Sequence, residues 1–175
     1  MWEIIDTSVS PENGTSLPLN ALTDTASIYY RAELAGYQVN PRRWLQISEY
    51  AAKSFPNLGQ SFADLHAALS HAMAGNDEYL QKYMECNEGF AGDLVSYVSK
   101  AWSAIAKGEW MTAAKELAPK VEEFERFGGS RAQRDLLEYT YVNALLRSGD
   151  KKTAKHILST RRPKQSKSAP IHLLN

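Results

Sequence analysis

The sequence predicts an all-α protein, an α-solenoid of antiparallel helix pairs with about eight helices. Apolar residues recur at i, i+3, i+4 and i+7 through most of residues 19–162, which is the spacing of amphipathic helices. The period-two alternation that marks β-strands is absent. Glycines separate the helical segments at intervals of 39, 33 and 41 residues, the spacing of stacked helix pairs; they are Gly36, Gly75, Gly108 and Gly149.

Three regions follow from this pattern. Residues 1–18 are predicted to be an N-terminal segment and loop, residues 19–162 the helical-repeat domain, and residues 163–175 a basic polar tail. A domain of this size buries enough surface to fold without a metal or a disulfide. Three apolar side chains of the N-terminal segment are expected to form a short helical remnant against the domain, namely Trp2, Ile4 and Ile5.

The first two helices of the domain have clear boundaries. The first is expected over about residues 19–35 and stops at Gly36. Asn40 can cap the second helix, with Pro41 in the first helical position that proline favours. This second helix is expected to end before Pro56, because proline cannot continue a hydrogen-bonded turn.

The middle of the chain predicts four further helices. Ser61 is expected to cap the third and Asn76 the shorter fourth. The fifth is expected over about residues 91–107, and the sixth over about 109–127 with a kink or break at Pro119. On the sixth helix, pairs of opposite charge stand at the supportive i, i+4 spacing; they are Glu116 with Lys120 and Glu122 with Arg126.

The stretch Gly128-Gly129-Ser130-Arg131-Ala132-Gln133-Arg134-Asp135 joins the sixth helix to the seventh. The two glycines can stop a helix. Ser130 can cap the next one, and Gln133, three residues later, completes a capping box. The seventh helix is expected to end near Arg147, and the eighth to start at Asp150.

The joints between helices repeat. Gly108 to Ala113 and Gly149 to Ala154 share the form Gly-x4-Ala, and Gly75 to Leu80 is a weaker copy. The joint Gly108-x-Trp110-x-x-Ala113 resembles that of tetratricopeptide repeats. Most of the tryptophan, tyrosine and proline positions of that consensus are missing, so the repeats are interpreted as degenerate.

Three further segments stand out, namely Tyr30 to Gly36 with Val39 and Arg43-Trp44, then Phe62 to Ala67 running on to Ala74-Gly75-Asn76, and Gly128 to Asp135. Together they resemble the C-terminal part of the tetratricopeptide repeat protein 38 family, over roughly residues 21–158. The chain departs from the family in its shorter length and in Asn40-Pro41-Arg42 before Arg43-Trp44. The resemblance implies an α-helical repeat fold and carries over no catalytic residue.

Five polar residues form a candidate site. His66 lies on the apolar side of its helix, and we expect it near Asp64 and near the group Gln133, Arg134 and Asp135. One interpretation is a ligand-binding cluster or an acid/base pair. The other, which we favour, is a structural hydrogen-bond network between helices, since buried polar groups need partners.

Other classes of function find little support. The net charge is zero, so no nucleic-acid partner is expected even with a basic tail. Cys86 is alone, no phosphate-binding loop or nucleophile motif occurs, and neither a metal nor another cofactor is expected. Apolar runs are too short for a membrane helix, and there is no secretory signal, so the expected location is cytoplasmic.

The sequence therefore predicts a non-enzymatic scaffold or adaptor with a protein or peptide partner, because stacked helix pairs create an extended binding surface. The alternative is a small-ligand-binding protein or an enzyme that uses the cluster around His66 and Arg134. Bare apolar surface on the first helices would also favour a homodimer.

Overall fold

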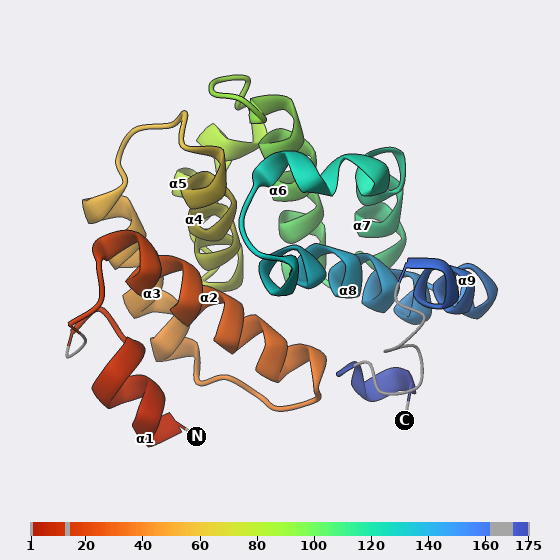
Figure 1. Cartoon of the computed structure of the whole chain (residues 1–175), viewed down its shortest axis with the longest axis horizontal. Helices are drawn as coiled ribbons and strands as arrows, with labels where there is room; N and C mark the ends of the chain where they lie inside the picture. Colours follow the sequence, from red (N-terminus) through yellow and green to blue (C-terminus); the bar gives the residue numbers. More distant parts are fainter. Residues whose placement is uncertain (1, 13–14, 162–169, 175) are drawn as a thin grey trace.

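The computed structural model describes residues 2–12, 15–161 and 170–174. Secondary structure in these residues is entirely helical, which confirms the predicted all-α class (Figure 1). The α-helices are α1 (Trp2–Ile4), α2 (Pro18–Leu34), α3 (Pro41–Ser54), α4 (Ser61–Met73), α5 (Asp77–Met84), α6 (Gly92–Ala106), α7 (Trp110–Leu117), α8 (Arg131–Arg147) and α9 (Lys151–Arg161). Shorter helices of other types are η1 (Ile5–Val9), η2 (Ala118–Phe127) and η3 (His172–Leu174).

The predicted break at Pro119 is confirmed. The segment is α-helical only to Leu117 and continues as the 3₁₀ helix η2. This change of helix type also alters the expected ion pairs, because three residues per turn bring positions i and i+3 together. Glu123 therefore pairs with both Lys120 (3.1 Å) and Arg126 (2.5 Å), in place of the predicted i, i+4 pairs.

Two of the predicted helix caps are confirmed. Asn40 Oδ1 accepts a hydrogen bond from the backbone N–H of Arg42 at 3.0 Å. Ser130 Oγ accepts from the N–H of Gln133 at 3.3 Å, while Gln133 Oε1 accepts from the N–H of Ser130 at 2.6 Å. The capping box thus fixes the start of α8.

The predicted cap at Ser61 is wrong, and that at Asn76 is only positional. Ser61 is the first residue inside α4, and its hydroxyl accepts from the backbone N–H of Ala91 at 3.1 Å. Asn76 precedes α5, but its side-chain amide donates to Ser48 Oγ at 3.4 Å. In both cases the side chain forms a hydrogen bond with a residue from another part of the fold, and not with the first turn of the helix that it was predicted to cap.

The repeated glycine joints have one common geometry. All four glycines have a positive φ, between 70° and 95°, the conformation that lets a helix end in a Schellman turn. In each joint, the residue after the glycine donates its N–H to the carbonyl five residues earlier. These bonds run from Tyr37 to Ala32, Asn76 to His71, Glu109 to Ala104 and Asp150 to Leu145. The four glycine joints thus share one turn geometry.

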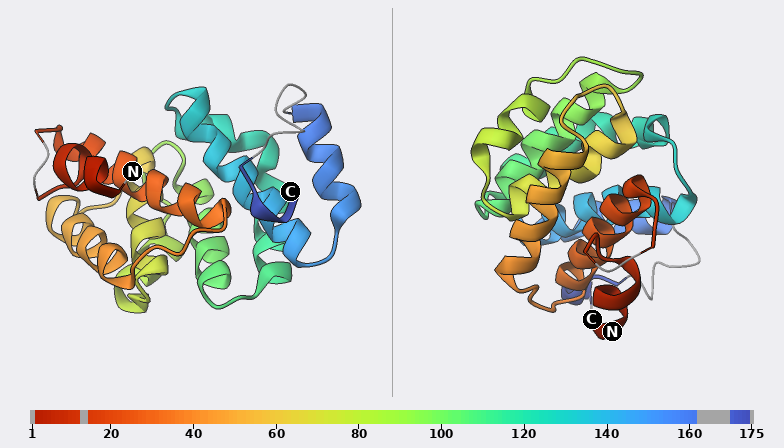
Figure 2. Two further views of the ribbon diagram at one scale, coloured as in Figure 1. Left: turned by 90° about the horizontal axis from the view of Figure 1, so that it is seen from below. Right: turned by 90° about the vertical axis from the view of Figure 1, so that its left-hand side faces the viewer.

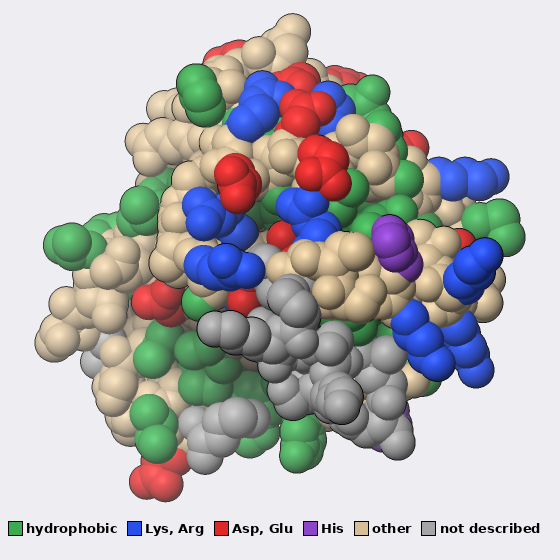
Figure 3. Space-filling model, turned by 45° about the vertical axis from the view of Figure 1, so that its right-hand side comes forward, with side chains coloured by type: hydrophobic (Ala, Val, Ile, Leu, Met, Phe, Trp, Pro, Cys, Tyr) green, Lys and Arg blue, Asp and Glu red, His purple; other side chains and the backbone are tan. Residues whose placement is uncertain are grey.

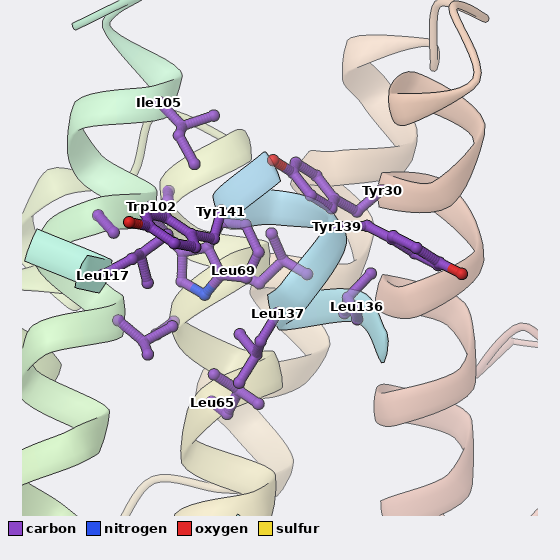
Figure 4. Packing of buried hydrophobic residues seen from close by; sticks show 14 of the residues in the cluster. Tyr30, Leu65, Leu69, Trp102, Ile105, Leu117, Leu136, Leu137, Tyr139 and Tyr141 are labelled. Carbon is purple, nitrogen blue, oxygen red and sulfur yellow. The ribbon is translucent and has the colours of Figure 1, made fainter. Parts of the chain in front are cut away.

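Most helix contacts follow chain order. Each helix from α2 to α9 packs against the next. In addition, α2 packs against α4, and α4 packs against α6. The side chains of α4 and α8 are buried almost all round, and Figure 4 shows α8 residues such as Leu137 directed toward α4 and Tyr139 lying on the α2 side. Tyr30 and Trp102 meet edge to face, with ring centroids 4.7 Å apart.

One contact departs from chain order, since α2 also packs against α8 (Figures 1 and 2). The first and the seventh helices of the predicted domain thus meet, and α8 also packs against α7, α9 and η2. The N-terminal residues cover part of α2, with Ile5 buried and the rings of Trp2 and Tyr29 6.0 Å apart.

The surface carries charges of both signs. On the face seen in Figure 3, Lys and Arg side chains are interleaved with Asp and Glu. No described helix is long and apolar enough to cross a membrane. Residues 163–169 and 175 of the predicted basic tail, among them Lys164 and Lys167, lie outside the described residues.

Candidate functional site

His66 is buried in α4 and bonded at both ring nitrogens. Nδ1 lies 2.7 Å from the carbonyl oxygen of Phe62, and Nε2 lies 3.1 Å from Ser27 Oγ on α2. A carbonyl only accepts, so Nδ1 carries the proton and Nε2 accepts from the serine hydroxyl. Burial lowers the pKa of His66 to about 4, and the charge of Arg31 acts in the same direction. The imidazole is therefore neutral near pH 7.

Arg31 links α2 to α8 and was not among the predicted site residues. Its guanidinium donates to the backbone carbonyl of Ala132. Burial lowers the pKa of Arg31, and the nearby Asp135 opposes this effect. The charge of Arg31 thus acts on His66 of α4, and the charge of Asp135 on α8 acts on Arg31.

Phe62 and Gly129 complete the contact between the three helices. The Phe62 ring meets the His66 ring edge to face at 4.8 Å. A β-carbon on Gly129 would lie 2.8 Å from Phe62 Cε2, closer than packed atoms approach, so this backbone needs glycine. We call Ser27, Arg31, Phe62, His66, Gly129, Ala132 and Asp135 the α2–α4–α8 junction. It unites parts of the three segments that carry the family resemblance.

Asp64 does not belong to this junction. Its carboxylate accepts from the backbone N–H of Gly59 at 2.9 Å. Burial raises the pKa of Asp64, while the Gly59 N–H and the charge of Lys82 lower it. Asp64 therefore orders the loop before α4, and the predicted Asp64–His66 pair does not form, because positions i and i+2 point to different sides of a helix.

Arg134 and Gln133 also point elsewhere. Arg134 lines a hollow of about 250 Å³ between η2, α8 and the end of α9, together with Arg131, Glu138 and Arg161. Gln133 caps α8 and borders a second hollow, of about 260 Å³, at the mouth of the junction. Of the five predicted residues, the structure thus places His66 and Asp135 at the junction and Gln133 at its edge.

The Ser27–His66 contact has the geometry of a nucleophile and its general base. Ser27 borders the 260 Å³ hollow with Arg31, so a small molecule there would meet both a hydroxyl and a cation. Two features oppose catalysis. The pKa of about 4 makes His66 a weak base at neutral pH, and both side chains are at least nine-tenths buried. The contact is better explained as a structural link between α2 and α4.

Another hollow, of about 630 Å³, lies between residues 6–12, α2 and α3. We call it the α2–α3 groove. Arg43 forms one wall, where it donates to Asp6, to Oδ2 at 2.8 Å, and to the Tyr29 hydroxyl at 3.3 Å. The Arg43 guanidinium also lies 5.0 Å from the centre of the Trp2 ring. The bond from Arg43 holds the pKa of Asp6 below its usual value.

The rim of the α2–α3 groove carries exposed charged side chains. Arg42, Glu49 and Lys53 border it, are exposed, and form no ion pair with other described residues. Gln46 donates to Glu12 across the groove at 3.1 Å. Little in the sequence predicts this groove. Of its surroundings, only Arg43-Trp44 belongs to the segments that carry the family resemblance.

No group of three or more His, Cys, Asp or Glu residues in the described ranges is placed to hold a metal ion. Cys86 is a buried free thiol, and burial raises its pKa. Comparison of the chain with protein-family models finds no match, and comparison with solved structures finds none either.

Proposed function

We propose that this protein is a non-enzymatic interaction module built from degenerate tetratricopeptide-like helix pairs, akin to the C-terminal part of the tetratricopeptide repeat protein 38 family. The observation that carries the proposal is the four-fold recurrence of one glycine joint, each followed by a helix that packs back on its predecessor. Repeats of this kind serve mainly as binding scaffolds. The single, buried Cys86 fits a reducing compartment, and we infer a cytoplasmic location.

The partner surface that we propose is the α2–α3 groove. Helix α8 packs against α2, α7, α9 and η2, and residues 135–146 of it are buried, so it offers little surface to a peptide. The groove offers about 630 Å³, within the range of ligand-binding sites. Its floor presents Tyr29 and Ile47, while its rim presents Arg42, Glu49 and Lys53. This combination suits an extended peptide with an apolar side chain flanked by charges of both signs.

The test compares two variants of equal charge change. Arg42→Glu with Lys53→Glu reverses the rim, whereas Lys100→Glu with Lys115→Glu changes exposed residues of α6 and α7. Proteins that co-purify with the wild type from native lysate should be lost with the rim variant and retained with the control. Identical recovery with both variants would refute the groove as the partner surface.

A second candidate function, hydrolysis or small-ligand binding at the junction, rests on the Ser27–His66 contact and the adjacent 260 Å³ hollow. A fluorophosphonate probe tests the hydrolytic form directly. Labelling of Ser27 that disappears in Ser27→Ala and falls strongly in His66→Gln would favour it over the scaffold. Absence of labelling in the folded wild type leaves the junction a structural link.

A further inference from the structure

A small hollow lies where the helices α2, α4, α6 and α8 end. Its volume is about 160 Å³, and it shares no lining residue with the α2–α3 groove or with the two hollows beside α8. Trp110, the first residue of α7, also lines it. Figure 4 shows two other lining residues, Tyr30 of α2 and Ile105 of α6, toward the same end of the buried cluster. We call this space the helix-end hollow.

The helix-end hollow is lined by equivalent positions of the four glycine joints. In every joint, the residue two positions before the glycine borders the hollow. These residues are Leu34, Met73, Ala106 and Arg147. Three of them are apolar and one is charged, so the hollow combines an apolar wall with a cation.

Two opposite charges border the hollow without pairing. Neither Glu33 nor Arg147 forms an ion pair with any described residue, including each other. Burial raises the pKa of the Tyr30 hydroxyl, the charge of Glu33 raises it further, and the charge of Arg147 lowers it. Both charges therefore act on one buried group, while the space between them is left for a ligand.

Asn143 supplies an independent sign of a ligand. Its side chain is only 6% exposed and borders the hollow. Within the described part of the chain, no hydrogen bond joins its amide to another residue. Buried amides are normally bonded, and this one offers both a donor and an acceptor. A polar molecule in the hollow would satisfy it.

The two charged side chains suit different groups of a ligand. The Arg147 guanidinium lies 4.6 Å from the centre of the Trp110 ring, and such stacking holds its plane while its N–H edges stay available to a carboxylate. Glu33 accepts from Trp44 Nε1 through Oε1 at 2.8 Å, and its negative charge attracts an ammonium group. The partial negative charge of the surrounding helix C-termini acts in the same direction.

The size of the hollow limits the ligand. A volume of 160 Å³ equals that of about five water molecules in the liquid. It is smaller than the pockets of about 300–1,000 Å³ that hold drug-sized molecules. The ligand is therefore small, with a positive and a negative group close together.

We propose that the helix-end hollow binds a free α-amino acid with a small apolar side chain. The ligand carboxylate contacts Arg147, its ammonium group contacts Glu33, and Asn143 bonds to the polar end. The ligand side chain packs against Leu34, Met73 and Ile105. This site goes beyond partner binding in the α2–α3 groove and does not depend on it.

Three related probes test which groups the hollow recognises. L-valine carries both charged groups, isovalerate lacks the amino group, and isobutylamine lacks the carboxylate. NMR titration of the full chain should give a Kd for L-valine below about 1 mM. Each analogue should bind at least about tenfold more weakly, because it leaves one charge of the protein without its partner.

Matched substitutions assign each group to its residue. Arg147→Gln should weaken binding of L-valine and isovalerate and leave isobutylamine unchanged. Glu33→Gln, which keeps an acceptor for Trp44, should weaken L-valine and isobutylamine and leave isovalerate unchanged. Lys115→Gln and Glu78→Gln remove the same charges at exposed positions outside the hollow. Neither control should alter any of the three affinities.

Several results would overturn the proposal. One is the absence of binding with a Kd below about 10 mM for L-alanine, L-valine and L-leucine alike. Another is equal affinity for L-valine and isovalerate, which would show that no group on the protein recognises the ammonium. A third is unchanged L-valine binding in folded Arg147→Gln. If circular dichroism shows that Glu33→Gln is unfolded, the comparison of L-valine with isovalerate on the wild type tests the ammonium contact without a substitution.

Discussion

The Arg31 guanidinium on α2 donates a hydrogen bond to the backbone carbonyl of Ala132 on α8, 101 residues further along the chain. This bond joins α2 to α8. His66, Phe62 and Gly129 pack around the same contact. Residues distant in sequence thus meet in one contact between these helices.

Arg31→Ala should lower the free energy of unfolding by about 0.5–1.5 kcal/mol, because it removes the hydrogen bond between α2 and the Ala132 carbonyl. Arg42→Ala is the matched control, since Arg42 is exposed at the start of α3. Urea unfolding followed by circular dichroism gives both values. Equal stability of the two variants would show that the α2–α8 bond contributes nothing.

Substitutions at the neighbouring Gly128 and Gly129 distinguish two costs of adding a side chain, namely backbone strain and collision with other atoms. Both have a positive φ, 73° for Gly128 and 75° for Gly129. A β-carbon on Gly128 meets no atom within 4 Å, whereas one on Gly129 meets Phe62 and Gln133 at 2.8 Å. Gly128→Ala should cost about 1–3 kcal/mol, because a φ of 73° with a ψ of −152° is essentially restricted to glycine.

Gly129→Ala should cost about 1 kcal/mol more than Gly128→Ala, because it also displaces Phe62 and the capping side chain. The measurement is the midpoint of urea unfolding for each variant. The same midpoint for both would mean that Phe62 shifts without loss and that the junction is loosely packed.

His66 should make the protein less stable in mild acid. Its pKa is about 4 in the folded protein and near 6.5 when unfolded. Between these values only the unfolded chain takes up the proton, so stability falls as the pH drops from 6.5 towards 4. The loss from this residue is about 2 kcal/mol at pH 5.

His66→Gln should remove that part of the pH dependence between pH 7 and 5. Burial also lowers the pKa of His71 to about 4. His71 remains in the variant, so its own contribution to the pH dependence of stability remains as well. Burial raises the pKa of Asp24, Glu33 and Asp64, and these act in the opposite direction in both proteins. His156→Gln, at an exposed position, serves as the control. A pH profile unchanged in His66→Gln would contradict the buried, neutral imidazole.

The ion pairs of η2 should contribute little. Asp93 on α6 bonds to Arg126 (2.7 Å) and Lys120 (3.3 Å), and the Arg126 bond is the main cause that lowers its pKa to about 2. Its side chain is nevertheless 48% exposed. Asp93→Asn should therefore cost less than about 1 kcal/mol in low salt. The difference from the wild type should vanish in 1 M NaCl, where charges are screened within about 3 Å.

Local signals predict the helices well, because caps and glycine stops act over a few residues. Asn40, Pro119 and the Ser130–Gln133 box each act where the sequence places them. Ser61 shows the limit of such signals. The same residue type can cap a helix or bond elsewhere, and here the Ala91 N–H, 30 residues away, decides the outcome.

The junction could be predicted only in part. His66 stands out as a polar residue on an apolar helix face, and Asp135 belongs to the specific stretch before α8. Arg31 has a weaker signal, as the only charged residue between positions 25 and 32. Its partner could not be foreseen, because helical periodicity tells which face is buried and not which distant helix covers it.

The α2–α8 contact also affects how the protein is made. A ribosome adds about 5–20 residues per second, so α2 emerges roughly 5–20 s before the segment that carries Ala132. During this interval Tyr30 and Arg31 lack their α8 neighbours, and the inner face of the nascent chain is open to water and to other nascent chains. Helix α2 can therefore complete its native contacts only after α8 has left the ribosome.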